Sequence, residues 1–269
     1  MGEGRGEASG ADSGARPGDD LGAAVRLLWG PHPEPSRGPK RGLSLERIAR
    51  AGIEIAEAEG LAALSMQRVA GLVGVTKMAL YRYVPGKAEL VALMVETALG
   101  DAPPANAARP GWREQLADWT RQLGTVFHRH PWVLDATVGP RVLGPRELAW
   151  MEQALTALDG TGLSGAERMD AVVLLAGHVR SIAQQARAAG PAGNTEAQLG
   201  DILGKLMQAH GERYPALRAA LTSAVQQGGQ DQALEFGLAR ILDGLGLLIA
   251  ERAERTERTE RTERTERAD

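Results

Sequence analysis

The stretch VTKMALYRYVPGK, residues 75–87, holds basic and aromatic side chains at spacings that suit contact with DNA. On a helix of about 3.6 residues per turn, Lys77 and Tyr81 share one face, with Met78 and Arg82 beside them. The guanidinium of Arg82 can fork onto the O6 and N7 atoms of guanine, and Lys77 can reach the same acceptors or a phosphate. The stretch therefore predicts a helix whose exposed face can read bases.

Neighbouring side chains add contacts of other kinds to this face. Tyr81 and Tyr83 can pack their rings on the sugar–phosphate backbone and donate their hydroxyl groups to it. Met78 or Ala79 can contact a thymine methyl group, and Lys87, at the start of the next helix, can hold a phosphate together with backbone N–H groups. A basic surface helix that binds nothing is the alternative, because short patterns of this kind also recur by chance.

Two short helices joined by a glycine turn would position these residues. Ser65 is a suitable N-cap for a helix that ends at Gly74. Thr76 caps the next helix, which is expected to run to about Val84. In such a helix-turn-helix unit the second helix can lie in the major groove of DNA.

The apolar residues of the second helix predict how it packs. Leu80 and Val84 fall opposite the basic face. Val69 and Leu72 of the preceding helix are expected to cover them. The basic face is thereby left for solvent or for a partner.

The composition narrows the classes of function. The chain of 269 residues has a net charge of −3, which argues against a protein that coats nucleic acid along its whole surface but allows a local basic patch. It contains no cysteine, which excludes disulfides and thiolate metal sites, and it shows no apolar segment typical of a membrane span. We expect a cytoplasmic protein with no cofactor, no metal site and no membrane partner.

Alanine and leucine dominate the apolar residues, which favours an all-α fold. Hydrophobic spacing predicts a first helix from about Leu43 to Glu59, another from about Lys87 to Leu99, and a short helix or docking segment over residues 21–29. After a linker, further helices are predicted over about 111–129, 133–138, 144–158, 165–189, 195–210, 214–227 and 230–252.

The run LSMQRVAGLVGVTKMALYRYVPGKAELVALM, residues 64–94, resembles the N-terminal DNA-binding domain of TetR-family transcriptional regulators. The residues that carry the resemblance are Ser65, Gly74, Val75, Thr76, Leu80, Tyr81, Tyr83, Val84, Lys87 and Leu90. The resemblance covers about residues 43–100 and implies a dimer that binds operator DNA, with a larger helical domain for a small organic ligand. The basic segment SRGPKRG, residues 36–42, and the YRYVPGK pattern are most similar to the tetracycline-repressor-like branch.

The resemblance also implies a role for each matching position. The residues that would face bases are Gln67, Lys77, Met78, Ala79 and Arg82. The residues that would hold phosphates are Ser65, Tyr81, Tyr83 and Lys87. Met66 departs from the family pattern, because many members have Thr or another polar residue there that can touch phosphate.

Four regions are expected along the chain. They are a disordered N-terminal segment with a basic arm over 1–42, the helix-turn-helix DNA-binding domain over 43–100, a helical ligand-binding and dimerisation domain over 101–253, and a solvated Glu-Arg-Thr repeat tail over 254–269. The tail buries nothing, so it is interpreted either as a fraying helical extension or as disorder.

The arm SRGPKRG, residues 36–42, carries the basic side chains of Arg37, Lys40 and Arg41 ahead of the first helix. Flexible basic arms can enter the minor groove of DNA. A linker that only improves solubility is an equally weighted alternative.

The longest apolar helical stretches lie over residues 169–189 and 232–253. The resemblance implies that they pair with the same helices of a second copy as a four-helix interface. Small residues on both stretches would let such helices approach closely. The alternative is that they are central core helices of a single protomer.

Four of the five tryptophans lie between residues 112 and 150, in a chain poor in aromatic residues. Apolar walls with a few polar groups suit a small organic ligand. The candidate ligand contacts are Trp112, Trp119, Phe127, His128, Trp132, Trp150, Met151, His178 and Gln184, with His130 and Met207 also noted. Taken singly, each of these residues is more typical of a core than of a ligand site.

The prediction is therefore a ligand-responsive transcriptional repressor that binds a near-palindromic operator as a homodimer. An activator or a ligand-independent regulator of the same family is the first alternative. A helical enzyme that uses His128, His130 or His178 as acid–base groups is a weaker one, because no nucleophile–base spacing, phosphate-binding loop or metal motif supports it. A helical adaptor that acts through protein contacts alone is the third.

Overall fold

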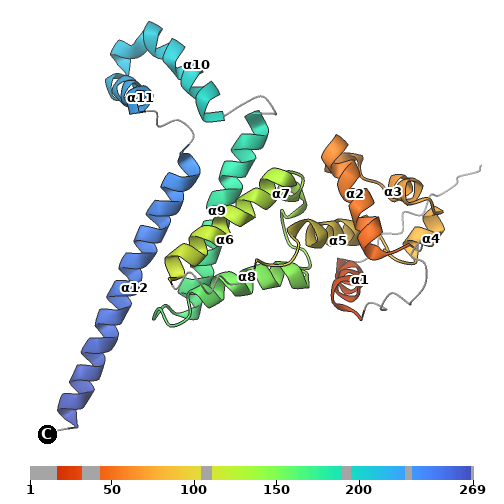
Figure 1. The fold of residues 1–269 in the computed structure, drawn as a ribbon, viewed down its shortest axis with the longest axis horizontal. Helices are drawn as coiled ribbons and strands as arrows, with labels where there is room; N and C mark the ends of the chain where they lie inside the picture. The colour runs from red at the N-terminus through yellow and green to blue at the C-terminus, as the bar shows by residue number, and fades with distance from the viewer. Residues whose placement is uncertain (1–16, 32–42, 104–110, 190–194, 228–231, 268–269) are drawn as a thin grey trace, which may run out of the picture.

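The computed structural model describes residues 17–31, 43–103, 111–189, 195–227 and 232–267 (Figure 1). Every regular element within these ranges is a helix, which confirms the all-α prediction. The α-helices are α1 (Pro17–Trp29), α2 (Leu45–Glu59), α3 (Met66–Val73), α4 (Lys77–Tyr81), α5 (Lys87–Leu99), α6 (Trp112–Arg129), α7 (Val133–Ala136), α8 (Pro145–Ala157), α9 (Gly165–Ala189), α10 (Thr195–His210), α11 (Pro215–Gln227) and α12 (Ala233–Glu266), with short 3₁₀ turns η1 (Leu61–Ala63) and η2 (Gly211–Arg213).

Helices α2 to α5 form the headpiece, the unit that contains the helix-turn-helix. The hydroxyl groups of Ser44, Ser65 and Thr76 each accept a hydrogen bond from the backbone N–H three residues ahead, as N-caps of α2, α3 and α4. Gly74, between α3 and α4, has φ 74° and ψ 36°, a left-handed conformation that costs glycine little. The N-caps at Ser65 and Thr76 and the turn at Gly74 are those that the sequence predicts.

Helix α4, which is predicted to face DNA, ends at Tyr81 and is therefore shorter than the predicted helix to Val84. The carbonyl oxygen of Leu80 accepts hydrogen bonds from the N–H groups of both Tyr83 and Val84, which closes the helix in a tight turn. Pro85 follows, and proline disfavours helical backbone in the residue before it. The chain therefore leaves the helix before Val84.

Val69 and Leu72 were predicted to pack over the apolar face of α4, and this prediction is correct for Val69 and wrong for Leu72. Leu80, Val84 and Val69 are fully buried, whereas the side chain of Leu72 is 51% exposed. The buried face of α3 is made by Met66, Val69, Ala70 and Val73, spaced three and four residues apart. Leu72 lies off that face.

Helices α6 to α12 form a second unit, which we call the sensor domain after its predicted role. Helix α9 packs against α6, α8 and α12, and its Val172, Leu175 and Val179 are buried. Helices α10 and α11 form a hairpin that projects beyond the packed helices, between the ends of α9 and α12 (Figure 1). No helix of the described ranges has the length and hydropathy needed to span a bilayer.

The N-terminal end of the described chain is more ordered than predicted, and the repeat at the C-terminal end takes the helical form that was one of its two interpretations. The sequence predicts disorder up to residue 20 and a short helix or docking segment over 21–29, whereas residues 17–29 form α1, which packs on α5 through Leu27 and Leu28. The Glu-Arg-Thr repeat is helical, because α12 continues through it to Glu266. Pairs of Glu and Arg at four-residue spacing support that helix without burying it.

Candidate nucleic-acid interface and its connection to the sensor domain

The exposed face of α4 presents charge and one large apolar side chain to solvent. Lys77 and Arg82 are exposed, and the side chain of Met78 is 75% exposed. Tyr81 is half-buried against the core, and the Lys77 amino group lies 5.6 Å from the centre of its ring. Packing of the headpiece explains Tyr81 in part, but it does not explain an exposed methionine beside two cations.

Residues of α3 and α5 flank this face. Gln67 on α3 is exposed, and Ala79 on α4 is half-buried. Tyr83 and Lys87 are exposed where the chain enters α5. The hydroxyl oxygen of Ser65 accepts from the N–H of Arg68 at 3.3 Å, which leaves the hydroxyl proton able to donate to a phosphate.

The cations of this face differ from Arg50 and Arg68 of the headpiece, which have carboxylate partners. Arg50 pairs with Glu46 at 2.6 Å, and Arg68 makes a two-bond ion pair with Glu59. The hydrogen bonds from Arg68 hold the pKa of the Glu59 carboxyl below its usual value. Within the described residues, no ion pair neutralises Lys77 or Arg82. Their charges stay available to an anion.

The predicted arm residues Arg37, Lys40 and Arg41 lie outside the described residues. Their neighbours on either side are placed, because Pro31 follows α1 and Leu43 precedes α2. The basic segment therefore joins two helices that both pack in the headpiece region.

Part of the predicted aromatic cluster is brought together by the fold. The rings of Trp119 and Trp150 meet edge to face with centroids 6.3 Å apart, and both are buried. The Trp119 indole N–H donates to the Trp150 carbonyl oxygen at 2.8 Å, and the Trp150 indole donates to the Gly100 carbonyl oxygen at 3.4 Å. This pair serves the packing of α6 and α8 and also contacts the end of α5.

The other candidate ligand contacts are dispersed. Phe127 is buried beneath the guanidinium of Arg180, and Trp132 is buried with an indole N–H that has no partner among the described residues. His178 lies 3.0 Å from the Leu234 carbonyl oxygen. The remaining positions are half-buried at Trp112, Met151, His130 and Met207, and exposed at His128 and Gln184.

A hollow of about 230 Å³ lies between α6 and α12, and none of the predicted ligand contacts lines it. Its walls are Arg113, Glu114, Ala117, Arg121, Glu235, Leu238, Ala239 and Leu242. The two arginines are already paired, Arg121 with Glu235 at 2.8 Å and Arg113 with Asp243. The hollow is thus more polar than the aromatic site that the sequence predicts.

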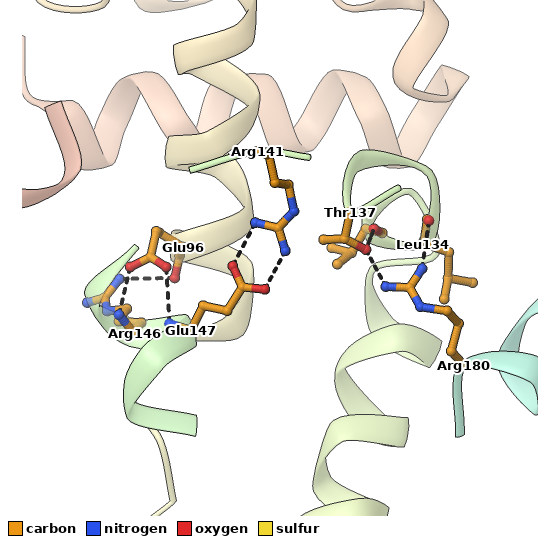
Figure 2. Close-up of polar contacts among 8 residues, drawn as sticks. Glu96, Leu134, Thr137, Arg141, Arg146, Glu147 and Arg180 are labelled. Atoms are coloured by element: carbon orange, nitrogen blue, oxygen red, sulfur yellow. Dashed lines mark hydrogen bonds and ion pairs between the residues drawn. The ribbon is translucent and has the colours of Figure 1, made fainter. Parts of the chain in front are cut away.

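Glu96, which no sequence pattern singles out, connects the headpiece to the sensor domain (Figure 2). Its carboxylate on α5 accepts hydrogen bonds from the backbone N–H groups of Arg146, at 2.8 Å, and Glu147, at 3.1 Å, in the first turn of α8. Burial raises the pKa of Glu96, although these two hydrogen bonds act in the opposite direction. The one signal that could have indicated it is a glutamate inside the apolar run VALMVETAL.

A second group of polar contacts orders the loop that leads into α8 (Figure 2). Arg141 makes a two-bond ion pair with Glu147. From α9, Arg180 donates to the Leu134 carbonyl oxygen at 2.9 Å and to the hydroxyl group of Thr137. Burial, and then the charge of Arg141, lower the pKa of Arg180.

Two descriptions of known families match the chain. "Bacterial regulatory proteins, tetR family" matches residues 43–94, and "Tetracyclin repressor-like, C-terminal domain" matches residues 104–249. The first match contains α2, α3, α4 and most of α5, and the second contains the sensor domain up to the middle of α12. Helix α1 lies outside both.

Several proteins with similar sequences or structures are regulators from Streptomyces species. The HTH-type transcriptional repressor DrrR1 of Streptomyces coeruleorubidus is 38% identical over 242 residues, which are 87% of this chain and 88% of that protein. The structure of the TetR family protein ActR of Streptomyces coelicolor in complex with actinorhodin is 27% identical, with a TM-score of 0.64, over 76% of this chain and 95% of that one. A possible TetR family transcriptional regulator from Streptomyces coelicolor A3(2) is 25% identical, with a TM-score of 0.63, over 76% of this chain and 100% of that one.

Proposed function

This chain belongs to the TetR family of bacterial transcriptional regulators, and we propose that it is a repressor that a small organic molecule releases from its operator. DNA binding in response to a ligand is the activity of the family. The sign of regulation follows from the 38% identical relative, which is a repressor. A repressor of this kind meets its operator in the cytoplasm, which is therefore the proposed location.

The observation that carries the DNA-binding surface is the exposed basic face of α4. Lys77 and Arg82 lie there without carboxylate partners in the described structure, next to the exposed Met78. Such a set gives both charge for phosphates and donors or methyl contacts for base edges. The residues proposed to read bases are Gln67, Lys77, Met78, Ala79 and Arg82, and those proposed to hold phosphates are Ser65, Tyr81, Tyr83 and Lys87.

The proposed repressor is a homodimer that pairs through α9 and α12. Val173 on α9 is 62% exposed and Leu247 on α12 is 70% exposed, and both lie on helices whose other faces are buried. A β-carbon at Gly177 or Gly244 would meet no other atom, so a partner helix has room to approach there. Two-fold pairing would match a near-palindromic operator, in which half-sites are about one helical turn, or 34–36 Å, apart.

The proposed ligand site is the aromatic region of the sensor domain around Trp119 and Trp150. ActR, a structural relative, is in complex with actinorhodin in one structure and with (S)-DNPA in another, so this architecture accommodates small molecules. A ligand releases DNA only if it binds the conformation with the wrong headpiece spacing more tightly than the DNA-binding one. Tight binding to both conformations would change nothing.

The test is selection of bound fragments from the genome that encodes the protein, followed by titration of the enriched sequence at several salt concentrations. We expect a near-palindromic site whose affinity falls steeply with salt, because Lys and Arg release counterions from phosphates. Repeating the selection with candidate ligands, starting with actinorhodin, identifies those that reduce recovery. A random set of fragments bound with equal affinity would contradict the proposal.

The same experiment distinguishes the alternatives. An activator or a ligand-independent regulator would select a defined site but keep it in the presence of every ligand. The enzyme and adaptor alternatives predict no selected site, and the family match to transcriptional regulators already disfavours an enzyme.

A further inference from the structure

The first turn of α8 takes its cap from the headpiece. Helix N-termini leave backbone N–H groups without partners inside the helix, and a side chain at the N-cap position usually accepts one of them. The N-cap of α8 is Gly144, which has no side chain. The N–H groups of Arg146 and Glu147 instead donate to the carboxylate of Glu96, on α5 (Figure 2).

The space beside Gly144 is occupied by this carboxylate. A β-carbon there would overlap the carboxyl group of Glu96. The backbone of Gly144, with φ −92° and ψ 175°, is in the extended region that any residue adopts. A residue with a side chain at position 144 would therefore meet no backbone strain, but it would displace the Glu96 carboxylate from the first turn of α8.

Other groups tie the same part of α8 to the end of α5. The guanidinium of Arg146 contacts Asp101 at 3.0 Å and the Glu96 carbonyl oxygen at 3.4 Å. The ion pair with Asp101 is exposed on the carboxylate side, so it contributes little by itself. The buried carboxylate of Glu96 is the group whose loss leaves N–H donors unsatisfied.

A hydrogen bond from α1 also reaches the residue before the N-cap of α8. The indole N–H of Trp29 donates to the Leu143 carbonyl oxygen at 2.9 Å, immediately before Gly144. Leu27 and Leu28 anchor α1 on α5. Helix α1 lies outside both family matches, so this tie adds to the contacts within the two matched regions.

We propose that Glu96 and Trp29 are positioning residues that lock the headpiece to the first turn of α8, so that the sensor domain sets the orientation of the headpiece. Helix α8 also packs against α6 and α9, so a change among these helices on ligand binding is passed to Glu96. The lock itself is inferred from these contacts alone. Only its role, which is to change the spacing of two headpieces on DNA, rests on the proposed function.

The test separates capping of α8 from locking of the headpiece. Glu96→Ala removes both. Glu96→Ala combined with Gly144→Ser gives α8 a local N-cap, in the space that the carboxylate leaves. Trp29→Phe keeps a ring on α1 and removes its N–H donor. Glu152→Ala, at an exposed position of α8, is the matched control.

Two measurements on the full-length chain report the two effects. Hydrogen exchange at the amides of Arg146 and Glu147 reports the cap. Because the chain contains no cysteine, Ala62→Cys in the headpiece and Thr156→Cys on α8, both exposed, can carry spin labels alone. Labelled chains diluted with unlabelled protein give the distance between the labels within one chain, with no need for DNA, ligand or dimer.

We expect one narrow distance distribution in the otherwise unchanged chain and in the control, and a distribution at least twice as broad in Glu96→Ala. The double variant should regain slow exchange at Arg146 and Glu147 and keep the broad distribution. Trp29→Phe should broaden it without changing that exchange. A narrow distribution in the double variant would show that Glu96 only caps α8, and an unchanged distribution in Trp29→Phe would remove α1 from the lock. Either result is independent of whether an operator is found.

Discussion

At the residue scale, basic side chains of the headpiece differ in whether a carboxylate neutralises them. Arg50 and Arg68 are neutralised by glutamates, whereas Arg82 and Lys87 have no such partner in the described structure. A guanidinium can hold two acceptors of one base in a fixed plane, while an ammonium at a helix N-terminus acts on a phosphate of any sequence. Arg82 is therefore expected to determine which site is bound, and Lys87 how tightly.

Arg82→Ala should relax the preference for one base pair, with a loss of discrimination of about 1–3 kcal/mol at that position. Lys87→Ala should weaken binding to all sites alike and lower the salt dependence by about one counterion. Both effects are measured by titrating the selected operator and its single-base variants at several salt concentrations. Arg50→Ala, on the exposed side of α2, is the control. A uniform loss from Arg82→Ala would count against base reading.

Tyr81→Phe separates two roles of one side chain. Because Tyr81 is half-buried against the core, Tyr81→Ala would weaken the headpiece as well as any phosphate contact. Tyr81→Phe removes only the hydroxyl group, so we expect weaker binding to every site with an unchanged melting temperature. Titration of the operator, together with calorimetry, checks both. An unchanged affinity would mean that the ring acts in packing alone.

Glu167 ties two helices of the sensor domain in a way that pH can test. Its carboxylate accepts from the Ser164 N–H at the start of α9 and pairs with Arg252 on α12. These hydrogen bonds, that from Arg252 foremost, lower the pKa of Glu167 to about 2 from an ordinary value of 4.5. A carboxyl group with a lowered pKa in the folded state stabilises the fold above its unfolded pKa and loses that effect as the pH falls.

Glu167→Gln should accordingly lower the melting temperature at neutral pH. The difference from the unchanged chain should shrink as the pH falls from about 4.5 towards 2, where the carboxyl group takes up its proton. Calorimetry across that range measures it, with Glu152→Gln, at an exposed position, as the control. A difference that stays constant down to pH 2 would contradict the ion pair.

At the element scale, the presence of α1 means that the basic segment connects two helices and is not a free N-terminal arm. Residues 32–42 connect α1, which is held on α5, to α2. A segment fixed at both ends starts with less conformational freedom to lose on binding than a free arm of the same length. Deleting residues 1–41 would remove α1 and its contact at Leu143 together with the basic side chains, so it would not test the arm alone.

Substituting the three basic residues tests the arm while α1 stays in place. The variant Arg37→Gln, Lys40→Gln, Arg41→Gln should bind operator more weakly and with a shallower salt dependence, by about 0.9 in the logarithmic slope for each phosphate that the arm no longer neutralises. The slope is obtained from titrations at several salt concentrations. Equal slopes in both proteins would show that the segment is only a linker.

Sequence patterns predicted the elements whose signals are local. The caps at Ser65 and Thr76 and the bounds of α9 and α10 were predicted correctly, because capping and helical periodicity depend on neighbouring residues. The end of α4 and the exposure of Leu72 were not, because both depend on how the headpiece packs. Lys77, Arg82 and the other proposed DNA contacts stay predictions until a complex is measured.

The connection between the domains could not be predicted from spacing. Glu96 and Arg146 are 50 residues apart, and no local pattern indicates that one caps the helix of the other. The aromatic cluster shows the same limit. Trp119 and Trp150 do meet, whereas His128 and Gln184 face solvent and the hollow between α6 and α12 is lined by other residues.

At the scale of the whole molecule, α9 and α12 present apolar side chains that the single chain leaves uncovered. The exposed ones are Met169, Val173 and Leu174 on α9, and Phe236 and Leu247 on α12. Apolar surface on two neighbouring helices is typical of an association site. In the proposed dimer these residues become core, and the distance between the headpieces is set by how the four helices pack.

Val173→Glu should convert the dimer to monomers at micromolar concentration, because it places an unpaired charge in the proposed interface. Operator affinity should fall with it, since each monomer reaches one half-site. Light scattering and operator titration measure the two effects. Val138→Glu, at a position that is 71% exposed in a loop, should leave the dimer intact. Persistence of the dimer in Val173→Glu would place the interface elsewhere.

The length of α12 affects how the size of the molecule must be measured. Its 34 residues extend for about 51 Å at a rise of 1.5 Å per residue. The final turns, built from the Glu-Arg-Thr repeat, extend beyond the packed helices (Figure 1). A projecting rod raises hydrodynamic friction far more than it raises mass. Gel filtration calibrated with compact standards will therefore report too large a particle, and removing residues 254–269 should move the elution volume by more than the decrease in mass predicts.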